Sequence, residues 1–196
     1  MRTIVFVIAT FAAALFIGTG SAWYVIDHGT SLTTERIGSC ASWTTEGHPR
    51  ADLYTKAHLA RSGRLPLSST AARYFVARTD SDGYALSASC EYAIAGPSIN
   101  ARWWSLALYD DQGFVIGNPS QRYSFNSNEL LRRADGTYRV NLSKNARPEN
   151  WLPSGDDSGR NLVLMLRIYS PRVTDATGTG QVLPDRLPKI ERKSCD

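Results

Sequence analysis

The chain has 196 residues and carries 22 lysines and arginines against 18 aspartates and glutamates, which gives a formal net charge of +4. These basic residues are scattered, whereas a nucleic-acid-binding protein gathers them on one face or helix, so composition argues against nucleic acid as a partner. Charges of both signs, ordinary apolar content and no low-complexity block or internal repeat also exclude a disordered or repeat protein.

The N-terminal segment is the longest apolar stretch of the chain. Residues 3–26 contain no charged side chain, and about 20 apolar residues in a helix cross the hydrocarbon core of a bilayer. Trp23 and Tyr24 stand where an interfacial aromatic belt would lie, and basic Arg2 favours the cytoplasmic side. The segment therefore predicts a membrane-spanning anchor, with residues from Asp27 onward exported.

A cleaved signal peptide is the alternative reading of this segment. Gly20-Ser21-Ala22 offers a weak small-residue cleavage site before Trp23. Apolar residues continue beyond that site to Ile26, which favours the uncleaved anchor. The expected location is the inner membrane, with a single span and the C-terminal domain in the periplasm.

The remainder of the chain has the size of one domain. Removing the first 26 residues leaves about 170, typical of a single hydrophobic core. We expect residues 1–26 to form the anchor or uncleaved signal, residues 27–50 to form a polar linker that wraps onto the domain, and residues 51–196 to form the domain itself.

Three cysteines, Cys40, Cys90 and Cys195, occur in this exported part. Export favours disulfides, and an odd count leaves one thiol unpaired. A Cys90–Cys195 bond would tie the C-terminus to an expected strand and close a loop of about 100 residues, worth roughly 4–5 kcal/mol. Cys40–Cys90 is the alternative pairing. No two cysteines are close enough in sequence to form a metal-ligand pair, so no metal site is expected.

A short helix is expected over residues 51–63. Asp52 is a suitable N-cap, Leu53, Ala57 and Ala60 fall on one face, and Gly63 is suited to end the helix.

From Arg73 onward the pattern changes to the period of two that is typical of strands. Asp80-Ser81-Asp82-Gly83 has turn chemistry and predicts a hairpin between Tyr74–Arg78 and Leu86–Ile94. Further short elements are expected as strands at Trp103–Tyr109, Phe114–Ile116, Tyr123–Phe125 and Tyr138–Leu142, and as a helical turn at Asn128–Arg133.

The segment 162–170 is apolar on both faces, because Leu162, Leu164, Leu166 and Ile168 alternate with Val163 and Met165. Such a pattern is typical of a central strand. Short strands separated by turns predict a mainly β fold: an antiparallel β-sandwich or jelly-roll-like domain with one or two short helices, preceded by the transmembrane helix.

Histidine, serine and acidic motifs offer little chemistry. His28, His48 and His58 lack the helical spacing of a zinc site, and no Gly-x-Ser-x-Gly elbow is present. Asp80-Ser81-Asp82-Gly83 has glycine at its fourth position, where a calcium-binding EF-hand loop has it at the sixth. A hairpin turn is expected there, with a weak surface calcium site as the alternative.

The best candidate site is a set of aromatic and arginine side chains. Aromatic walls with a few fixed donors suit a sugar or a flat organic acid. Neighbouring strand residues point to opposite faces, so at most one of the two adjacent tryptophans faces the main core. The alternative is that the whole set belongs to the core and its rim. The candidate ligand-binding residues are Arg102, Trp103, Trp104, Trp151, Arg167 and Tyr169, with Tyr109 nearby.

Catalysis has weaker support than binding. The acids near this set in sequence are Asp110, Asp111 and Glu91, and glycoside hydrolysis requires two carboxylates roughly 5–9.5 Å apart across a groove. Acids in a glycine-ended turn usually face solvent. We therefore expect a binding or structural module without a cofactor, and an enzyme acting on a carbohydrate or small organic acid is the alternative.

Three motifs in combination carry a family resemblance: Arg102-Trp103-Trp104, Asn150-Trp151-Leu152-Pro153 and Leu166-Arg167-x-Tyr169-x-Pro171. Over roughly Ile37 to Cys195 the chain resembles the family called domain of unknown function 1214. Residues 51–67 resemble the preceding part of its short, membrane-anchored bacterial members. The resemblance implies a β-sandwich, jelly-roll-like domain and no established activity.

The resemblance has two further implications. Longer relatives carry a second uncharacterised domain before this one, so a function that needs both would depend on a partner here. Cys40 stands where the family has a tryptophan in a Gly-Pro-Trp-like stretch, which supports Cys40 as the unpaired cysteine. We expect a membrane-anchored, exported binding or envelope-associated interaction module, whose partner is an envelope protein or a small carbohydrate or acid.

Overall fold

The computed structural model describes residues 2–68, 71–156, 159–171 and 186–195. The chain divides into two compact units. One, called the N-terminal unit, comprises Met1–Thr34 and Trp43–Pro66, and the other, called the sandwich unit, comprises Glu35–Ser42 and Leu67–Asp196.

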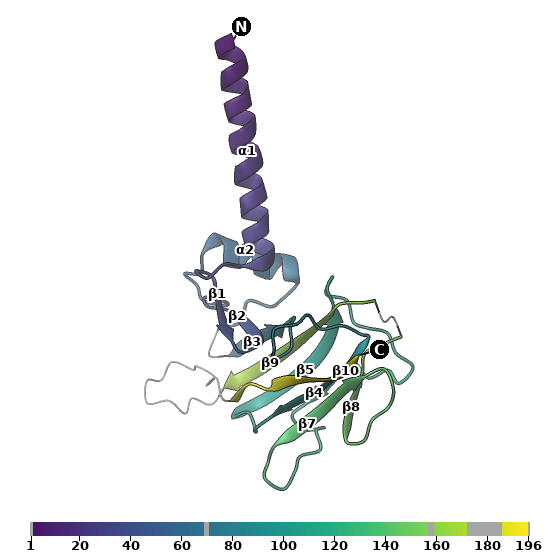
Figure 1. Ribbon diagram of the computed structural model, residues 1–196. Coiled ribbons are helices and arrows are strands. Elements are labelled where there is room, and N and C mark those ends of the chain that lie inside the picture. Colours follow the sequence, from purple (N-terminus) through teal and green to yellow (C-terminus); the bar gives the residue numbers. More distant parts are fainter. Residues whose placement is uncertain (1, 69–70, 157–158, 172–185, 196) are drawn as a thin grey trace. The chain divides into compact units, whose positions relative to one another are not determined.

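The N-terminal unit begins with helix α1, Arg2–His28 (Figure 1). Its 27 residues include none that is buried, and in length and composition the helix is long and apolar enough to cross a membrane. The apolar segment predicted from the sequence is thus a single continuous helix.

Helix α2, Leu53–Ser62, follows in the same unit and has the caps that the sequence predicted. The Asp52 carboxylate accepts a hydrogen bond from the Thr55 backbone N–H at 2.9 Å, which satisfies one of the free donors of the first turn. Gly63 ends the helix in the left-handed conformation, with φ 64°.

The sandwich unit is built on two sheets. The larger sheet has six strands in the order β1 (Thr34–Ile37), β2 (Cys40–Trp43), β3 (Ala72–Ala77), β9 (Leu162–Pro171), β5 (Ala101–Asp110) and β6 (Ser124–Asn126). The smaller has four, in the order β10 (Lys189–Cys195), β4 (Cys90–Gly96), β7 (Tyr138–Ser143) and β8 (Asn150–Pro153). Strands β7 and β8 pair in parallel, whereas β2–β3, β3–β9, β9–β5, β5–β6, β10–β4 and β4–β7 pair antiparallel.

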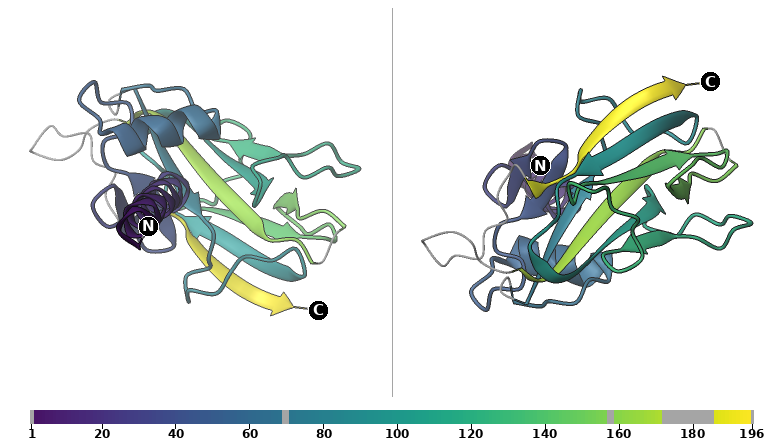
Figure 2. Two further views of the ribbon diagram at one scale, coloured as in Figure 1. Left: turned by 90° about the horizontal axis from the view of Figure 1, so that it is seen from above. Right: turned by 90° about the horizontal axis from the view of Figure 1, so that it is seen from below.

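The hydrophobic core lies between these sheets (Figure 2). The larger sheet contributes buried residues such as Phe75, Trp104 and Leu166, and the smaller sheet contributes Tyr92 and Val140. The predicted mainly β sandwich is confirmed. Strand β9 pairs with β3 on one side and β5 on the other, so it is the central strand that its two-sided apolar pattern predicted.

The predicted hairpin between Tyr74–Arg78 and Leu86–Ile94 is wrong. The turn forms and is closed by the bridge Thr79↔Ala85, but the chain then crosses to the other sheet, where β4 begins only at Cys90. Strand β9 occupies the place beside β3 that β4 would need. Local alternation predicts which face a strand buries but not which strand is its neighbour.

Two smaller elements also differ from the prediction. Phe114–Ile116 is not a strand, since its one ladder contact is the isolated bridge Tyr109↔Val115. Residues 128–133 form turns and an isolated bridge instead of helix. A three-residue segment can form few hydrogen bonds with a neighbouring strand, and a single helical turn is unfavourable to nucleate alone.

Cys90 and Cys195 form a disulfide, the pairing that the sequence analysis expected. The two residues face each other in the β4–β10 pairing, so the bond fastens the last strand to the smaller sheet. Cys40 is a free, buried thiol, and burial raises its pKa to about 11.

Candidate functional site

The structure separates the two adjacent tryptophans, as strand geometry requires. Trp104 faces the core and is 1% exposed, whereas Trp103 lies half-buried on the opposite face of β5. That face is the outer face of the six-stranded sheet. The predicted site residues therefore do not form one group.

An aromatic and arginine group does form on this outer face, and we call Trp103, Tyr109, Arg167 and Tyr169 the outer-face cluster. Trp103 on β5 is the direct cross-strand partner of Tyr169 on β9. Their ring centroids are 5.3 Å apart and the planes are tilted by 54°, a favourable arrangement for an aromatic pair.

Arg167 projects from β9 on the same face. Its guanidinium donates a hydrogen bond to the Tyr109 hydroxyl at 2.7 Å, and its Cζ lies 5.3 Å from the centre of the Tyr109 ring. A guanidinium carries five N–H donors, and among the described residues Tyr109 is its one hydrogen-bond acceptor. Within the described residues, four donors of this half-buried cation are therefore left for another acceptor.

The chemistry of the outer-face cluster follows from these two contacts. Aromatic faces offer apolar and stacking contact, and the guanidinium suits bidentate recognition of a carboxylate. A rigid central strand holds the cation in place. Aromatic faces beside a charged donor suit a ligand that carries both a ring and an anionic group.

The remaining predicted residues lie elsewhere. Trp104 packs against Tyr138 in the core, with centroids 5.0 Å apart, and neither its indole N–H nor the Tyr138 hydroxyl has a partner among the described residues. Burial, and to a lesser degree the nearby Cys40 thiol, raises the pKa of Tyr138. Arg102, on the core-facing side of β5, is exposed near the start of the strand.

Trp151 belongs to the other sheet. It lies half-buried on β8 next to the fully buried Leu152, which faces the core, so the indole is on the outer face of the smaller sheet. Its N–H donates to the Ser143 carbonyl at 3.0 Å, and Arg122 donates to the Trp151 carbonyl at 3.2 Å. Its polar atoms are engaged by neighbouring backbone and side chain.

The acids considered for catalysis are engaged elsewhere or lie apart from the cluster. Asp110 accepts hydrogen bonds from the backbone N–H groups of Gln112 at 3.1 Å and Phe114 at 2.8 Å, which shapes the turn. Asp111 is exposed in that turn. Glu91 is on the smaller sheet and is paired with Arg147. These three acids therefore do not form the two-carboxylate arrangement of a glycosidase around the cluster.

The Asp80 turn is the motif for which a calcium site was the alternative. Its Asp80 carboxylate interacts with groups of the protein. Asp80 is 1% exposed, and one of its carboxylate oxygens accepts from the backbone N–H groups of Asp82 and Tyr84, at 3.1 and 2.9 Å. The other oxygen lies 2.9 Å from the Arg192 guanidinium. Among the described residues no group of three or more His, Cys, Asp and Glu side chains could hold a metal ion.

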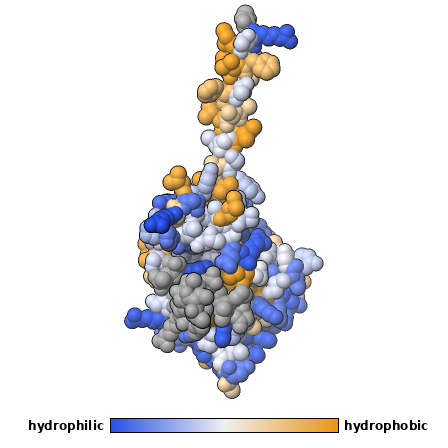
Figure 3. All heavy atoms as spheres, turned by 90° about the vertical axis from the view of Figure 1, so that its left-hand side faces the viewer, coloured by the Kyte–Doolittle hydropathy of each residue, from blue (hydrophilic) through white to orange (hydrophobic). Residues whose placement is uncertain are grey.

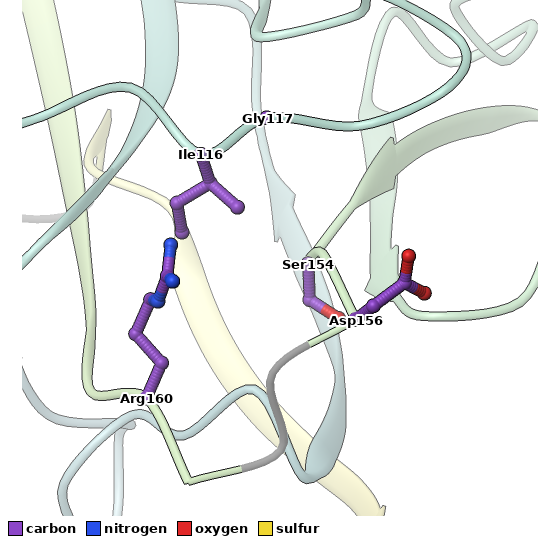
Figure 4. Close-up of a pocket in the computed structure, with 5 residues that line it drawn as sticks. All are labelled: Ile116, Gly117, Ser154, Asp156 and Arg160. Atoms are coloured by element: carbon purple, nitrogen blue, oxygen red, sulfur yellow. The ribbon is translucent and has the colours of Figure 1, made fainter.

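One further candidate, which we call the loop pocket, was not found from the sequence (Figure 4). It has a volume of about 300 Å³ and is lined by Ile116, Gly117, Ser154, Asp156 and Arg160. Ser154 is 1% exposed, and its hydroxyl has no hydrogen-bond partner among the described residues. Lining charges of opposite sign give the pocket no clear preference for an anion or a cation.

The loop pocket combines segments that are far apart in the sequence. Gly155 shapes it: the residue has φ 83°, and a Cβ there would lie 2.6 Å from Ile116 Cγ2, so only glycine fits. In the sequence, the loop pocket is indicated by position alone: Ser154 and Gly155 directly follow the motif Asn150-Trp151-Leu152-Pro153.

These features define a β-sandwich domain in a chain that starts with a long apolar helix. The chain belongs to the family described as "Protein of unknown function (DUF1214)", whose profile matches residues 71–173, more than half of the chain. The match is shorter at both ends than the stretch Ile37–Cys195 over which the motifs resemble the family.

Two solved structures are similar to the chain. The VPA0106 protein from Vibrio parahaemolyticus has 22% identity and a TM-score of 0.61, over 90% of this chain and 43% of that one. At that identity the likeness shows the fold alone, and this chain spans less than half of the Vibrio protein. An uncharacterized protein from Burkholderia cenocepacia has 16% identity and a TM-score of 0.41, over 93% of this chain and 52% of that one. A search of curated proteins found no match.

Proposed function

We propose that the protein is a single-pass membrane protein of the bacterial envelope, and that its exported sandwich binds a small, ring-containing organic acid on the outer-face cluster. In this proposal residues 1–26 are the anchor, residues 27–50 wrap onto the domain and supply β1 and β2 to its larger sheet, and the rest of the chain lies in the periplasm.

Two features of the chain support this location. Helix α1 has the length and composition of a membrane span, and the basic residue at its start, Arg2, favours the cytoplasmic side. The disulfide Cys90–Cys195 fits an oxidising compartment such as the periplasm. An anchored, exported domain would meet ligands of the envelope.

The observation that carries the binding proposal is the position of Arg167. Its guanidinium lies half-buried on a central strand, beside Tyr109 and on the same face as the Trp103–Tyr169 pair, with one hydrogen bond to the protein among the described residues. A carboxylate would satisfy the remaining donors with charge-assisted hydrogen bonds, and a ring on the same molecule would contact the aromatic faces. A neutral sugar would supply only the second interaction.

A thermal-shift screen of the full chain in detergent micelles tests the proposal. The informative probes are matched pairs that differ only in a carboxylate in place of a hydroxymethyl group: glucuronate against glucose, and benzoate against benzyl alcohol. At a hundredfold excess over its dissociation constant a ligand stabilises the folded state by about 2.7 kcal/mol, which is several degrees for a domain of this size. We expect the acids to stabilise the protein more than their neutral partners.

Three variants locate the binding. Arg167→Met should abolish the shift caused by the acids. Arg122→Met is the matched control, because Arg122 also lies over an aromatic ring, 5.4 Å from the centroid of Phe125, but donates to backbone. Loss of the shift in Ser154→Ala and not in Arg167→Met would place the ligand in the loop pocket and contradict the proposal, as would equal shifts from charged and neutral probes.

A further inference from the structure

Three contacts fasten helix α2 to the C-terminal end of α1. The His58 ring donates from Nδ1 to the Ile26 carbonyl at 2.7 Å. Arg61 forms an ion pair with Asp27 at 3.4 Å, and its Cζ lies 5.5 Å from the centre of the Trp23 ring. The two helices therefore hold a defined orientation within the N-terminal unit.

That orientation is crosswise. Figure 1 shows α2 lying across the axis of α1 at the level of its last turns, and in the left view of Figure 2, where α1 is seen end-on, α2 is seen along its length. Where α1 crosses a bilayer, α2 then runs parallel to the membrane plane. Trp23 is five residues before the end of α1, about 8 Å along the helix, so α2 lies at the depth of the aromatic belt.

The solvent-facing side of this region is unusually apolar for a water-soluble surface. Leu53 is 80% exposed, Leu65 66%, Leu32 89% and Tyr54 44%. On α2 the buried residues are Thr55 and Leu59, while Leu53 faces outward, although a surface helix normally turns its apolar residues to the core.

Basic side chains border the exposed apolar residues. Lys56 and Arg61 on α2 are exposed, and long basic side chains extend their charge to the headgroups while their stems cover apolar surface. Figure 3 shows hydrophobic side chains along α1 and again around its base. The apolar region of the N-terminal unit is thus continuous with the helix that we assign to the membrane.

We propose that α2 is an interfacial helix and that the lipid surface is the partner of this exposed apolar region. Leu53 and Tyr54 enter the boundary between headgroups and acyl chains, with Leu32 and Leu65 on the flanking loops. Transfer of this apolar surface from water into the lipid is favourable, and the crosswise contacts keep α2 in that plane. The inference rests on the proposed anchoring by α1.

Nitroxide labels on the full chain in phosphatidylcholine–phosphatidylglycerol liposomes test it, with depth measured from the accessibility of each label to oxygen and to a water-soluble nickel chelate. The labelled variants are Leu53→Cys and Leu65→Cys. Leu131→Cys is the matched control, because Leu131 is as exposed as Leu65, at 66%, but belongs to the sandwich unit. Ala13→Cys in α1 reports the span, and the unmodified chain, with Cys40 buried, is the labelling blank.

We expect the labels at Leu53 and Leu65 to lie about 5–10 Å below the headgroups, the label at Ala13 deeper, and the label at Leu131 in water. Labels at Leu53 and Leu65 that match Leu131 while Ala13 stays in lipid would overturn the inference and leave the anchor standing. Labels at Leu53 and Leu65 that are shielded from both reagents would show that protein, not lipid, covers this region. That result would also overturn the inference. An aqueous Ala13 label would contradict the anchoring itself.

Discussion

Two regions of the sandwich unit combine tryptophan with arginine, and they use their polar groups in opposite ways. Around Trp151 the indole donates to Ser143 and Arg122 donates to the Trp151 carbonyl, so donors and acceptors are matched within the fold. In the outer-face cluster Arg167 donates to the Tyr109 hydroxyl, and most of its donors have no acceptor in the part of the chain that the structure describes.

This difference in hydrogen bonding shows that residue type alone does not define a binding site. Both regions have the aromatic and basic residues that a ligand-binding surface needs, and both belong to motifs of the family. What separates them is whether the polar atoms already have partners. We therefore interpret the Trp151 side as structural and the Trp103 side as available to a ligand.

The largest expected effect concerns the disulfide of the smaller sheet. Replacing Cys90 and Cys195 together with alanine opens a loop of 105 residues and should lower the free energy of unfolding by about 4 kcal/mol, measured by urea denaturation of the full chain in micelles. Acid binding at the outer-face cluster should persist below the new transition. A loss under about 1 kcal/mol would show that β10 stays fastened without the bond.

The next largest loss of stability is expected at Asn150, beside Trp151 on the smaller sheet. This side chain is 3% exposed; it accepts from the Leu131 N–H at 2.8 Å and donates to the Leu131 and Arg139 carbonyls at 2.9 and 2.8 Å. Asn150→Ala leaves these groups without partners and should cost about 3 kcal/mol by urea denaturation. Asn141→Ala, which removes one exposed hydrogen bond to Pro148, is the control. Equal losses of unfolding free energy in the two variants would contradict a larger contribution of Asn150 to stability.

The pH dependence of stability tests the burial of Cys40 on the core-facing side of the larger sheet. Burial raises the pKa of this thiol from 9.0 to about 11, so the folded state keeps a proton that the unfolded chain releases near pH 9. Stability should therefore fall as pH rises from about 9 to about 11, by about 3 kcal/mol. The measurement is urea denaturation across this range for the wild type and Cys40→Ala. Parallel pH curves would contradict the burial of a neutral thiol.

The smallest effect on stability is expected at Arg167. Arg167→Met removes one hydrogen bond at a half-buried position and should change the free energy of unfolding by less than about 1 kcal/mol, while it abolishes acid binding. Denaturation of this variant and of Arg122→Met in the same urea series provides the comparison. A loss at Arg167 as large as that of Asn150→Ala would make the cation a structural member of the sheet.

Local features of the fold could be predicted from the sequence. Helix α2 has its N-cap at Asp52 and ends at Gly63 because both signals act within one turn of the helix. The central position of β9 follows from apolar residues on both of its faces. The opposite orientation of Trp103 and Trp104 follows from strand geometry alone.

Features that depend on distant pairing could not be predicted in this way. Which strand lies beside β3, and therefore the failure of the expected hairpin, is decided by the packing of two sheets. The same packing puts Trp151 on a different sheet from Arg167 and divides the predicted site. The contact between Arg167 and Tyr109 and the loop pocket at Ser154 likewise join segments that no local pattern connects.

Hydroxyl-radical footprinting of the tryptophans most directly tests whether the ligand binds beside Trp103 and not beside Trp151. The full chain in micelles is oxidised with and without the acid that gives the largest thermal shift, and buried Trp104 serves as the unreactive reference. We expect the acid to protect Trp103 and to leave the oxidation of Trp151 unchanged. Protection of Trp151 with no change at Trp103 would contradict this expectation.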